Sequence, residues 1–556
     1  MNQEDGPRMD ELPICRRTRR SIGKTAKRSI EGIERVERAE RRSFGRMARP
    51  TLLRLATGSS ESRFARAAWS LALLLPLVSA CASAPAAAPR PAPLASVVDS
   101  VTTTPPLERT HWGIEAYDPE RGRTLLRLNP EKHFVPASNM KLVVTAVALA
   151  ELGPDFRYHT ELFAPRAAED SIAERIVVVG RGDPTLSGRF FESDVAPIEM
   201  LADSVRLAGV RRVRGDVVVD ASYFDAELVH PAWEVGDLPW YYAAPVAAFG
   251  IAEGAVPMVV EPGTAPGEPA VITFPEPAEA FILDNRLVTD TAGAGRAIRV
   301  TRLPGSYRLD VAGRVALDAA RDTLWLSVVE PAAHAGRALV AALERRGIKV
   351  EGDVRVVYDT AAAAALLPAG GDARRVALWQ SPPLTEIVAA ILKPSPNFIA
   401  EHPLKTLGAE RGERGSWWAG LEVERRYLSE RAGIDTAAVY LSDGSGLSAQ
   451  NLLTPHAVVQ LLDHARRQPW GAAYRAGLPE PGEEVGTLER RLQGFEGRVE
   501  AKTGTIAHVN SLSGYLRTER GDVIFSVLSN GSGVRSTLVR QAIDRIVAAM
   551  AEEGGR

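Results

Sequence analysis

The stretch PASNMKLVVTAVALAEL, residues 136–152, places a serine and a lysine three positions apart at the start of an apolar run. Read as a helix, it puts Ser138 and Lys141 on one face of the first turn, because positions i and i+3 are neighbours there. A serine at a helix start is often only a cap, with the lysine in solvent. The stretch alone therefore leaves a structural and a catalytic interpretation open.

Lysine is rare in this chain, because only eight of its 67 basic residues are lysines. They are Lys24, Lys27, Lys132, Lys141, Lys349, Lys393, Lys405 and Lys502. Arginine keeps its proton at any useful pH, whereas a lysine that is desolvated beside another cation can become a neutral base. A lysine in a chain that otherwise uses arginine therefore indicates a chemical role, although codon bias could explain the preference for arginine.

Three short motifs follow one another along the chain: Ser138-x-x-Lys141, Ser395-Pro396-Asn397 and Lys502-Thr503-Gly504. Each of them alone is weak, since such triplets occur by chance in chains of this length. We expect the first at a helix start, the second after a helix and the third on a strand. In this order and setting they resemble the active-site motifs of penicillin-binding proteins and serine β-lactamases.

The residue types suggest how such a site would work. A serine hydroxyl needs a neighbour that takes its proton, and the nine histidines are scattered singly without a plausible His/Asp pair. Lys141 can serve as this base if burial and the charge of Lys502 depress its pKa towards neutrality. The backbone N–H groups of Ser138 and Thr505 could hold the oxyanion of a tetrahedral intermediate.

The remaining motif residues are assigned to the substrate. Ser395 would relay the proton to the leaving amine, and Asn397 would hold Lys141 and a substrate amide. Lys502 and the substrate-binding run Thr503, Gly504 and Thr505 would receive a terminal carboxylate. The structural alternative is that Asn397 is a helix cap and Thr503 an ordinary strand residue.

The resemblance extends beyond the motifs to the S13 family of class C, low-molecular-mass penicillin-binding proteins, which are D-alanyl-D-alanine carboxypeptidases and endopeptidases. It covers about residues 105 to 550 and is carried by these stretches: PASNMK, GRGDPTL (181–187), GDVVVDASYFD (215–225), DLPWYYAAPVAAFGIAEG (237–254), PNFIAEHPLKTLG (396–408), LSDGSGLSAQNLLTP (441–455) and AKTGTIAHVNSLSGYL (501–516). The long gap between the first two motifs favours this family over β-lactamases, which have no room there for an extra domain. Pro396 stands where relatives usually have a polar residue, and because proline removes one N–H and stiffens the loop, it could shift Ser395. Arg181 replaces a more usual small residue.

The resemblance implies an α/β fold. We expect a penicillin-recognising serine transferase core, β-lactamase/transpeptidase-like, of antiparallel sheet plus helices. Residues 105–160 and 385–556 would form this catalytic domain, and residues 161–384, with short runs cut by Gly and Pro, an inserted β-rich region. The runs HWGIEAYDP and TLLRLNP predict a strand pair, and residues 497–531 predict three antiparallel strands packed by the helix STLVRQAIDRIVAAMAEE.

The first hundred residues indicate export. Residues 1–66 form a basic leader with little apolar periodicity, so translation from Met47 is an alternative start. Residues 67–81 resemble a secretion signal that ends in a lipobox, with Cys81 as the site of lipid attachment, although a standard signal cleaved nearby is the alternative. Residues 82–104 would be an extended Ala/Pro linker. We therefore expect an exported protein of the periplasm or cell envelope, anchored to the membrane by an N-terminal lipid.

The resemblance implies hydrolysis of peptidoglycan stem peptides ending in D-Ala-D-Ala, with β-lactams as covalent inhibitors. A formal net charge of −2 gives no reason to expect nucleic acid, and no metal or organic cofactor is implied. Two alternatives remain: a serine β-lactamase or esterase, and a catalytically inactive peptidoglycan-binding lipoprotein. The sequence does not separate carboxypeptidase from endopeptidase action.

Overall fold

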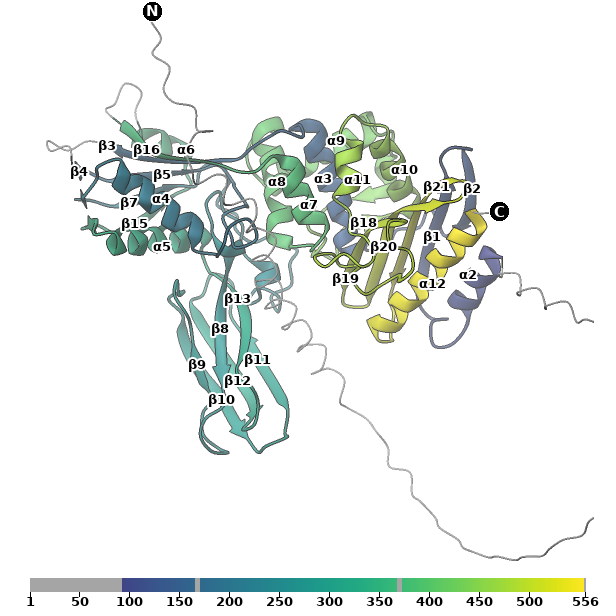
Figure 1. Cartoon of the computed structure of the whole chain (residues 1–556), viewed down its shortest axis with the longest axis horizontal. Helices are drawn as coiled ribbons and strands as arrows, with labels where there is room; N and C mark the ends of the chain where they lie inside the picture. The colour runs from purple at the N-terminus through teal and green to yellow at the C-terminus, as the bar shows by residue number, and fades with distance from the viewer. Residues whose placement is uncertain (1–92, 166–170, 368–372, 555–556) are drawn as a thin grey trace, which may run out of the picture.

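The computed structural model describes residues 93–165, 171–367 and 373–554 (Figure 1). The predicted leader, the signal, the lipid-attachment residue Cys81 and the linker up to residue 92 lie outside the described residues. Within the described ranges, no helix combines the length and the apolar character that a bilayer span requires.

The two ends of the described chain meet in one five-stranded antiparallel sheet, ordered β19-β20-β21-β1-β2. Its strands are β1 (His111–Asp118), β2 (Arg123–Leu128), β19 (Val499–Ile506), β20 (Val509–Thr518) and β21 (Gly521–Asn530). The predicted strand pair and the three predicted C-terminal strands are confirmed. Strand β19, which carries the third motif, is an edge of the sheet and so remains open on one side.

Helices α12 (Ser536–Gly554) and α2 (Leu94–Thr103) cover one face of this sheet (Figure 1). The prediction of an extended linker through residue 104 is wrong for residues 94–103, which form α2. In this segment Leu94, Val98 and Val101 recur with helical spacing and are buried in the same apolar cluster as residues of α12. The Ala/Pro run before the helix obscured this short amphipathic pattern.

A layer of helices lies on the other face of the sheet. It contains α3 (Met140–Glu151), α7 (Leu384–Leu392), α8 (Asn397–Arg411), α9 (Trp417–Glu430), α10 (Pro455–Arg466) and α11 (Gly471–Ala476). The predicted helix of the first motif is confirmed as a 3-10 turn, η2 (Ala137–Asn139), followed by α3. Every residue of α3 from Met140 to Leu149 is buried, so α3 is the central helix of the layer.

The region between β3 and β16 contains a mixed five-stranded sheet ordered β15-β7-β5-β3-β16. Its strands are β3 (His159–Pro165), β5 (Ile176–Gly180), β7 (Val217–Asp220), β15 (Val354–Val357) and β16 (Ala373–Gln380), and a small sheet adds β4 (Ile172–Ala173), β6 (Arg212–Val213) and β14 (Lys349–Val350). Helices α4 (Ala196–Leu207), α5 (Pro331–Arg345) and α6 (Thr360–Leu366) belong to the same region. The prediction of a β-rich insertion did not include these helices.

Two further three-stranded sheets project away from the rest of the molecule (Figure 1). They are formed by β8 (Ala255–Glu261), β9 (Val271–Thr273), β10 (Ile282–Asp290), β11 (Arg296–Thr301), β12 (Arg308–Ala316) and β13 (Asp322–Ser327). A small apolar core of their own, with Met258, Leu287 and Leu309 fully buried, holds the two sheets together.

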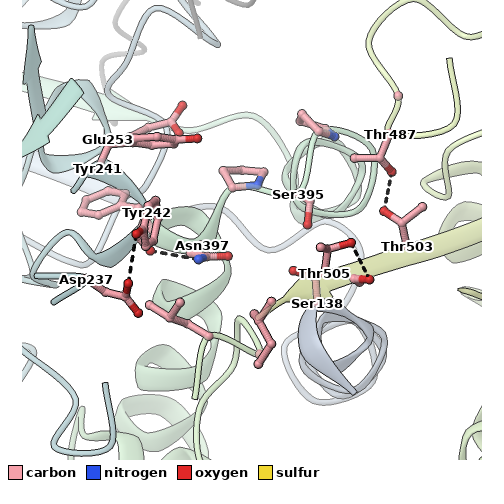
Figure 2. A pocket seen from close by; sticks show the side chains of 18 of the residues that line it. Ser138, Asp237, Tyr241, Tyr242, Glu253, Ser395, Asn397, Thr487, Thr503 and Thr505 are labelled. Atoms are coloured by element: carbon pink, nitrogen blue, oxygen red, sulfur yellow. Dashed lines mark hydrogen bonds between the residues drawn. The ribbon is translucent and has the colours of Figure 1, made fainter. Parts of the chain in front are cut away.

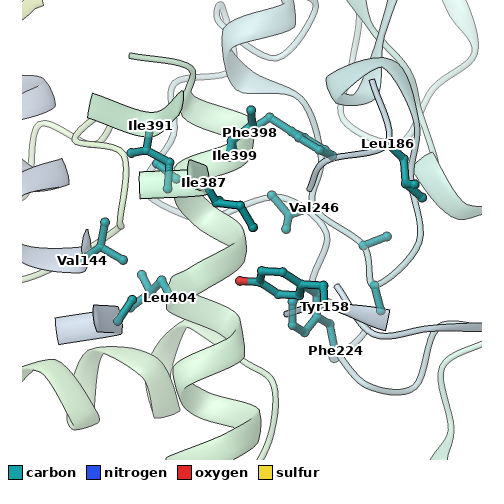
Figure 3. Packing of buried hydrophobic residues seen from close by; sticks show 14 of the residues in the cluster. Val144, Tyr158, Leu186, Phe224, Val246, Ile387, Ile391, Phe398, Ile399 and Leu404 are labelled. Carbon is teal, nitrogen blue, oxygen red and sulfur yellow. The ribbon is translucent and has the colours of Figure 1, made fainter. Parts of the chain in front are cut away.

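The insertion and the helical layer share one continuous apolar core (Figure 3). Phe224 and Val246 of the insertion, and Tyr158 directly before β3, lie in the same cluster as Val144 of α3 and Leu404 of α8. Because protein cores are densely packed, such a junction fixes the insertion relative to the helices that carry the first two motifs.

Candidate active site

A cavity of about 840 Å³ opens where the helical layer, the edge strand β19 and the loop before η3 (Tyr241–Ala243) meet. Six of the predicted site residues line it: Ser138, Ser395, Asn397, Thr503, Gly504 and Thr505. The two predicted lysines, Lys141 and Lys502, are fully buried next to it. The structure thus brings all three motifs together, whereas Cys81 lies outside the described residues.

Ser138 lies in the η2 turn directly before α3, against strand β19. A Cβ atom on Gly504 would lie 2.7 Å from Pro136 O and 3.0 Å from Ser138 N, so only glycine allows this close approach. The backbone is also strained nearby, because Ala137 has φ 48° and Ser395 has φ 68°. Such left-handed conformations cost roughly 1 kcal/mol or more in non-glycine residues and are often retained at functional sites.

Lys141 makes three hydrogen bonds, all of them to neutral oxygen atoms. Its Nζ donates to Ser138 Oγ at 3.0 Å, to Asn397 Oδ1 at 2.7 Å and to the backbone carbonyl of Ser445 at 2.7 Å. Burial lowers the pKa of Lys141 to about 7, although the negative charges of Glu401 and Asp443 oppose this shift. A large share of Lys141 is therefore neutral at physiological pH.

Lys502 reaches the second motif from β19. Its Nζ donates to Ser395 Oγ at 2.9 Å and to the Thr503 carbonyl at 3.0 Å. Burial, and then the nearby charge of Lys141, lower the pKa of Lys502 well below its usual value. Pro396 does not displace Ser395, because it occupies the position before α8, where its missing N–H is not needed.

Asn397, the first residue of α8, connects the lysine to the opposite wall of the cavity (Figure 2). Its Nδ2 donates to the Tyr242 carbonyl at 2.9 Å, and Tyr242 Oη donates to Asp237 Oδ1 at 3.0 Å. Burial raises the pKa of Asp237. These two wall residues are in the DLPWYY stretch that carried the resemblance, but the sequence offered no reason to assign them to the site.

Strand β19 forms the other wall and presents hydroxyl groups (Figure 2). Thr503 Oγ1 donates to Thr487 Oγ1 at 2.8 Å, and Thr505 Oγ1 donates to the Gly504 carbonyl at 2.8 Å. Thr487 could not be predicted from the sequence, because nothing in its flanking residues marks it as part of a motif.

The Ser445 carbonyl that accepts from Lys141 is positioned by two buried carboxylates. Glu401 accepts hydrogen bonds from the N–H of Ser445 at 2.7 Å and of Gly444 at 3.1 Å. Asp443 accepts from the N–H of Gly446 at 2.7 Å, which closes the turn. Burial and the charge of Asp443 raise the pKa of Glu401 to about 7. A backbone acceptor has no side-chain signature, so motif reasoning could not find it.

Within the described ranges, no group of three or more His, Cys, Asp or Glu side chains is arranged to hold a metal ion.

The D-Ala-D-Ala carboxypeptidase 3 (S13) family model matches residues 94–552. The chain is 37% identical over 471 residues to a D-alanyl-D-alanine carboxypeptidase of Actinomadura sp. (strain R39), and this match covers 82% of the chain and 84% of that protein. Penicillin binding protein 4 (dacB) of Haemophilus influenzae matches in structure with a TM-score of 0.71 and 22% identity, over 81% of this chain and 97% of that one. Its complex with a novel β-lactam matches with a TM-score of 0.68 and 22% identity over the same shares.

Proposed function

Because the chain belongs to the D-Ala-D-Ala carboxypeptidase 3 (S13) family, and is therefore a serine carboxypeptidase, we propose that it cleaves the D-Ala-D-Ala bond of peptidoglycan stem peptides through an ester on Ser138. The main support is the buried Lys141 amine, 3.0 Å from Ser138 Oγ and bonded only to neutral oxygen atoms. The proposal covers endopeptidase action as well, since both reactions break the same type of bond and differ only in the group that leaves.

Lys141 is the general base of the first step. In its neutral form the amine keeps two N–H donors, which the Asn397 amide oxygen and the Ser445 carbonyl accept. The remaining lone pair then faces Ser138 Oγ and takes the hydroxyl proton as the oxygen attacks the penultimate D-Ala carbonyl carbon. The two neutral acceptors therefore orient the base without restoring its charge.

The negative charge that develops on the substrate oxygen needs donors in place beforehand. The backbone N–H groups of Ser138 and Thr505 serve as this oxyanion hole, and the tight approach of β19 at Gly504 supports their proximity. Loss of one such donor typically lowers a rate by about a hundredfold or more.

Ser395 delivers a proton to the leaving amine. Its Oγ accepts a hydrogen bond from Lys502 Nζ in the resting site, so it can donate its own proton to the departing nitrogen while the C–N bond breaks. D-Alanine leaves as the free amine, and the acyl group stays on Ser138 as an ester. The Ser138 proton held by Lys141 then replaces the proton that Ser395 has given away, so Lys141 is neutral again before the second step. In that step a water molecule attacks the ester and loses a proton to Lys141, and Lys141 returns a proton to Ser138 Oγ as the peptide is released.

The same site would react with β-lactams, as the Haemophilus protein binds one in its structure. The strained amide takes the place of the D-Ala-D-Ala bond, and its opening leaves the leaving group tethered to the acyl-enzyme. We also propose that the protein acts outside the cytoplasm, where its substrate lies, with a lipid on Cys81 as its anchor.

Labelling with a fluorescent penicillin tests this function. The full chain should form a stable adduct on Ser138, detected by peptide mass mapping, and should release D-alanine from a pentapeptide ending in D-Ala-D-Ala. Ser138→Ala should lose both activities and still unfold cooperatively.

The matched control is Ser100→Ala, at an exposed position on α2, which should behave as the natural chain. Fast turnover of penicillin without D-alanine release would favour a β-lactamase. The absence of both an adduct and peptide cleavage would favour an inactive binding protein.

A further inference from the structure

Thr487 presents a hydroxyl group to the active-site cavity although it belongs to none of the three motifs (Figure 2). Its Oγ1 lies 2.8 Å from Thr503 Oγ1, from which it accepts a hydrogen bond. Its side chain is exposed in the open cavity. Two hydroxyl groups in contact share only one of their two protons, so the Thr487 proton remains available to a ligand.

The backbone around Thr487 is held on both sides. Thr487 N donates to the Lys393 carbonyl at 3.2 Å, and Lys393 Nζ forms an ion pair with Glu483 of the same loop. The next residue, Leu488, is completely buried. Lys393 also lies two positions before Ser395, so one segment supports both Thr487 and the second motif. The Thr487 hydroxyl is therefore positioned before any ligand arrives.

The charge distribution in the cavity favours an anion on this side. Three arginines, Arg490, Arg491 and Arg540, line the cavity from the C-terminal part of the chain, together with one carboxylate, Glu489. The insertion contributes three lining carboxylates, Glu234, Asp237 and Glu253, and one arginine, Arg189. Ion pairs offset part of this positive charge, since Arg491 pairs with Asp544 at 2.7 Å and Arg490 lies 3.8 Å from Glu489.

We propose that Thr487 is a further specificity-determining residue, whose hydroxyl donates a hydrogen bond to the C-terminal carboxylate of the substrate beside Thr503 and Thr505. A carboxylate accepts from several hydroxyl groups at once, and such charge-assisted bonds are stronger than neutral ones. A neutral ester in the same place is a weaker acceptor, so the hydrogen bond from Thr487 would stabilise it less. Thr487 thus selects for a free carboxylate, which deepens the proposed function and rests on it.

A pair of thioesters separates the carboxylate from the reaction itself. N-acetyl-D-alanyl thioglycolate ends in a carboxylate, whereas its methyl ester does not, and both carry the same reactive carbonyl. In the full chain, Thr487→Val should lower kcat/KM about tenfold for the acid, as expected for one hydrogen bond to a charged group. It should change kcat/KM for the methyl ester by less than about twofold, because there the lost bond is to a neutral acceptor near solvent.

Two variants serve as controls. Thr487→Ser retains the hydroxyl and should stay within about threefold of the natural chain for the acid, because its donor is restored. Thr301→Val removes an exposed threonine on β11, outside the residues that line the cavity, and should leave both thioesters unaffected.

The outcomes separate the two proposals. If the natural chain cleaves neither thioester and releases no D-alanine from the pentapeptide, the proposed function itself is wrong. If the natural chain is active but Thr487→Val slows both thioesters equally, or slows neither, Thr487 does not recognise the carboxylate. A loss confined to the acid and recovered by serine supports the inference.

Discussion

The pKa of Lys141 depends on the lack of a carboxylate among its hydrogen-bond partners. A carboxylate in direct contact would hold the ammonium charged, but its three partners are neutral oxygen atoms. The charged groups Glu401 and Asp443 act on it without being among these three partners and only moderate the effect of burial on its pKa. The site therefore keeps an amine that can accept a proton near neutral pH.

The pH dependence of acylation follows from this pKa. Below about pH 7, Lys141 is an ammonium that donates to Ser138 and cannot accept its proton, so acylation should be slow. As the pH rises through about 7 the neutral fraction grows, and the rate constant for penicillin acylation should rise with it. Measurement between pH 5 and 9 checks this, and a rate that falls over pH 6–8 would contradict it.

Lys141→Arg is the matched variant for the same residue. Arginine retains a positive charge but does not release its proton, so acylation should fall by at least about a hundredfold at every pH, the usual contribution of a general base. If Lys141→Arg kept the acylation rate and pH profile of the natural chain, Lys141 would not be the general base.

At the scale of single residues, the sequence was more informative about side chains than about backbone groups. The motif residues from Ser138 to Thr505 could be predicted because their residue types form a recognisable chemical pattern. Six of them line one cavity in the structure. The Ser445 carbonyl and its support by Glu401 could not be predicted, since any residue supplies a carbonyl. Thr487 could not be predicted either, because its role depends on the loop before β19 folding back against Thr503.

Strand β19 is the element on which the geometry of the site depends. It is an edge strand, and its open side faces the cavity. At Gly504 its backbone lies so close to the backbone of Pro136 and Ser138 that only glycine fits. A methyl group at position 504 would also lie 2.2 Å from Ser511 Oγ. The strand and the η2 turn must therefore separate if a side chain is added.

Gly504→Ala tests this close approach. The extra methyl group should push β19 away from Ser138 and misplace an oxyanion donor, so acylation by penicillin should fall by about a hundredfold. Overpacking should cost about 1–3 kcal/mol of stability, measured by urea unfolding. Gly533→Ala, where a Cβ would have open space, is the control and should be nearly neutral in both measurements. Unchanged acylation in Gly504→Ala would show that the approach is not needed.

Other elements were predicted with unequal success. The long apolar helix α3 and the C-terminal strands β20 and β21 were anticipated. The two strands are buried along most of their length, however, and do not alternate between buried and exposed residues. Helices α4 and α5 were not, because the Gly- and Pro-rich strands around them dominate the composition of that region. Their apolar faces are covered by the neighbouring sheet, a tertiary contact that composition does not reveal.

At the scale of the whole molecule, we propose that residues 161–384 form an insertion that completes the substrate pocket. The loop with Asp237, Tyr241 and Tyr242 lines the cavity and is tied to the projecting sheets. Ser327 N at the end of β13 donates to the Pro239 carbonyl at 2.9 Å. The buried Arg302 bridges the same parts, donating to the Leu238 carbonyl at 2.9 Å and to the Ser327 carbonyl at 2.6 Å.

Arg302→Met should loosen this bridge. The carbonyls of Leu238 and Ser327 would lose a buried donor, at a cost of about 1–3 kcal/mol in the free energy of unfolding. The loop should become less ordered, so KM for the pentapeptide should rise about three- to tenfold, by analogy with the loss of one hydrogen bond, while kcat changes less. Arg299→Met, an exposed position on β11, is the control. A KM equal to that of the natural chain in Arg302→Met would mean that the projecting sheets do not position the pocket wall.

The sheet that joins both ends of the described chain also determines at which point of protein synthesis the active site can form. A ribosome adding about 5–20 residues per second makes Ser138 early and the Lys502 strand last, tens of seconds later. Until β19 to β21 emerge, β1 and β2 lack their neighbours and the serine faces no second lysine. If the proposed function holds, a nascent polypeptide that still lacks β19 should have no hydrolytic activity, so the protein should become active only after its synthesis is nearly finished.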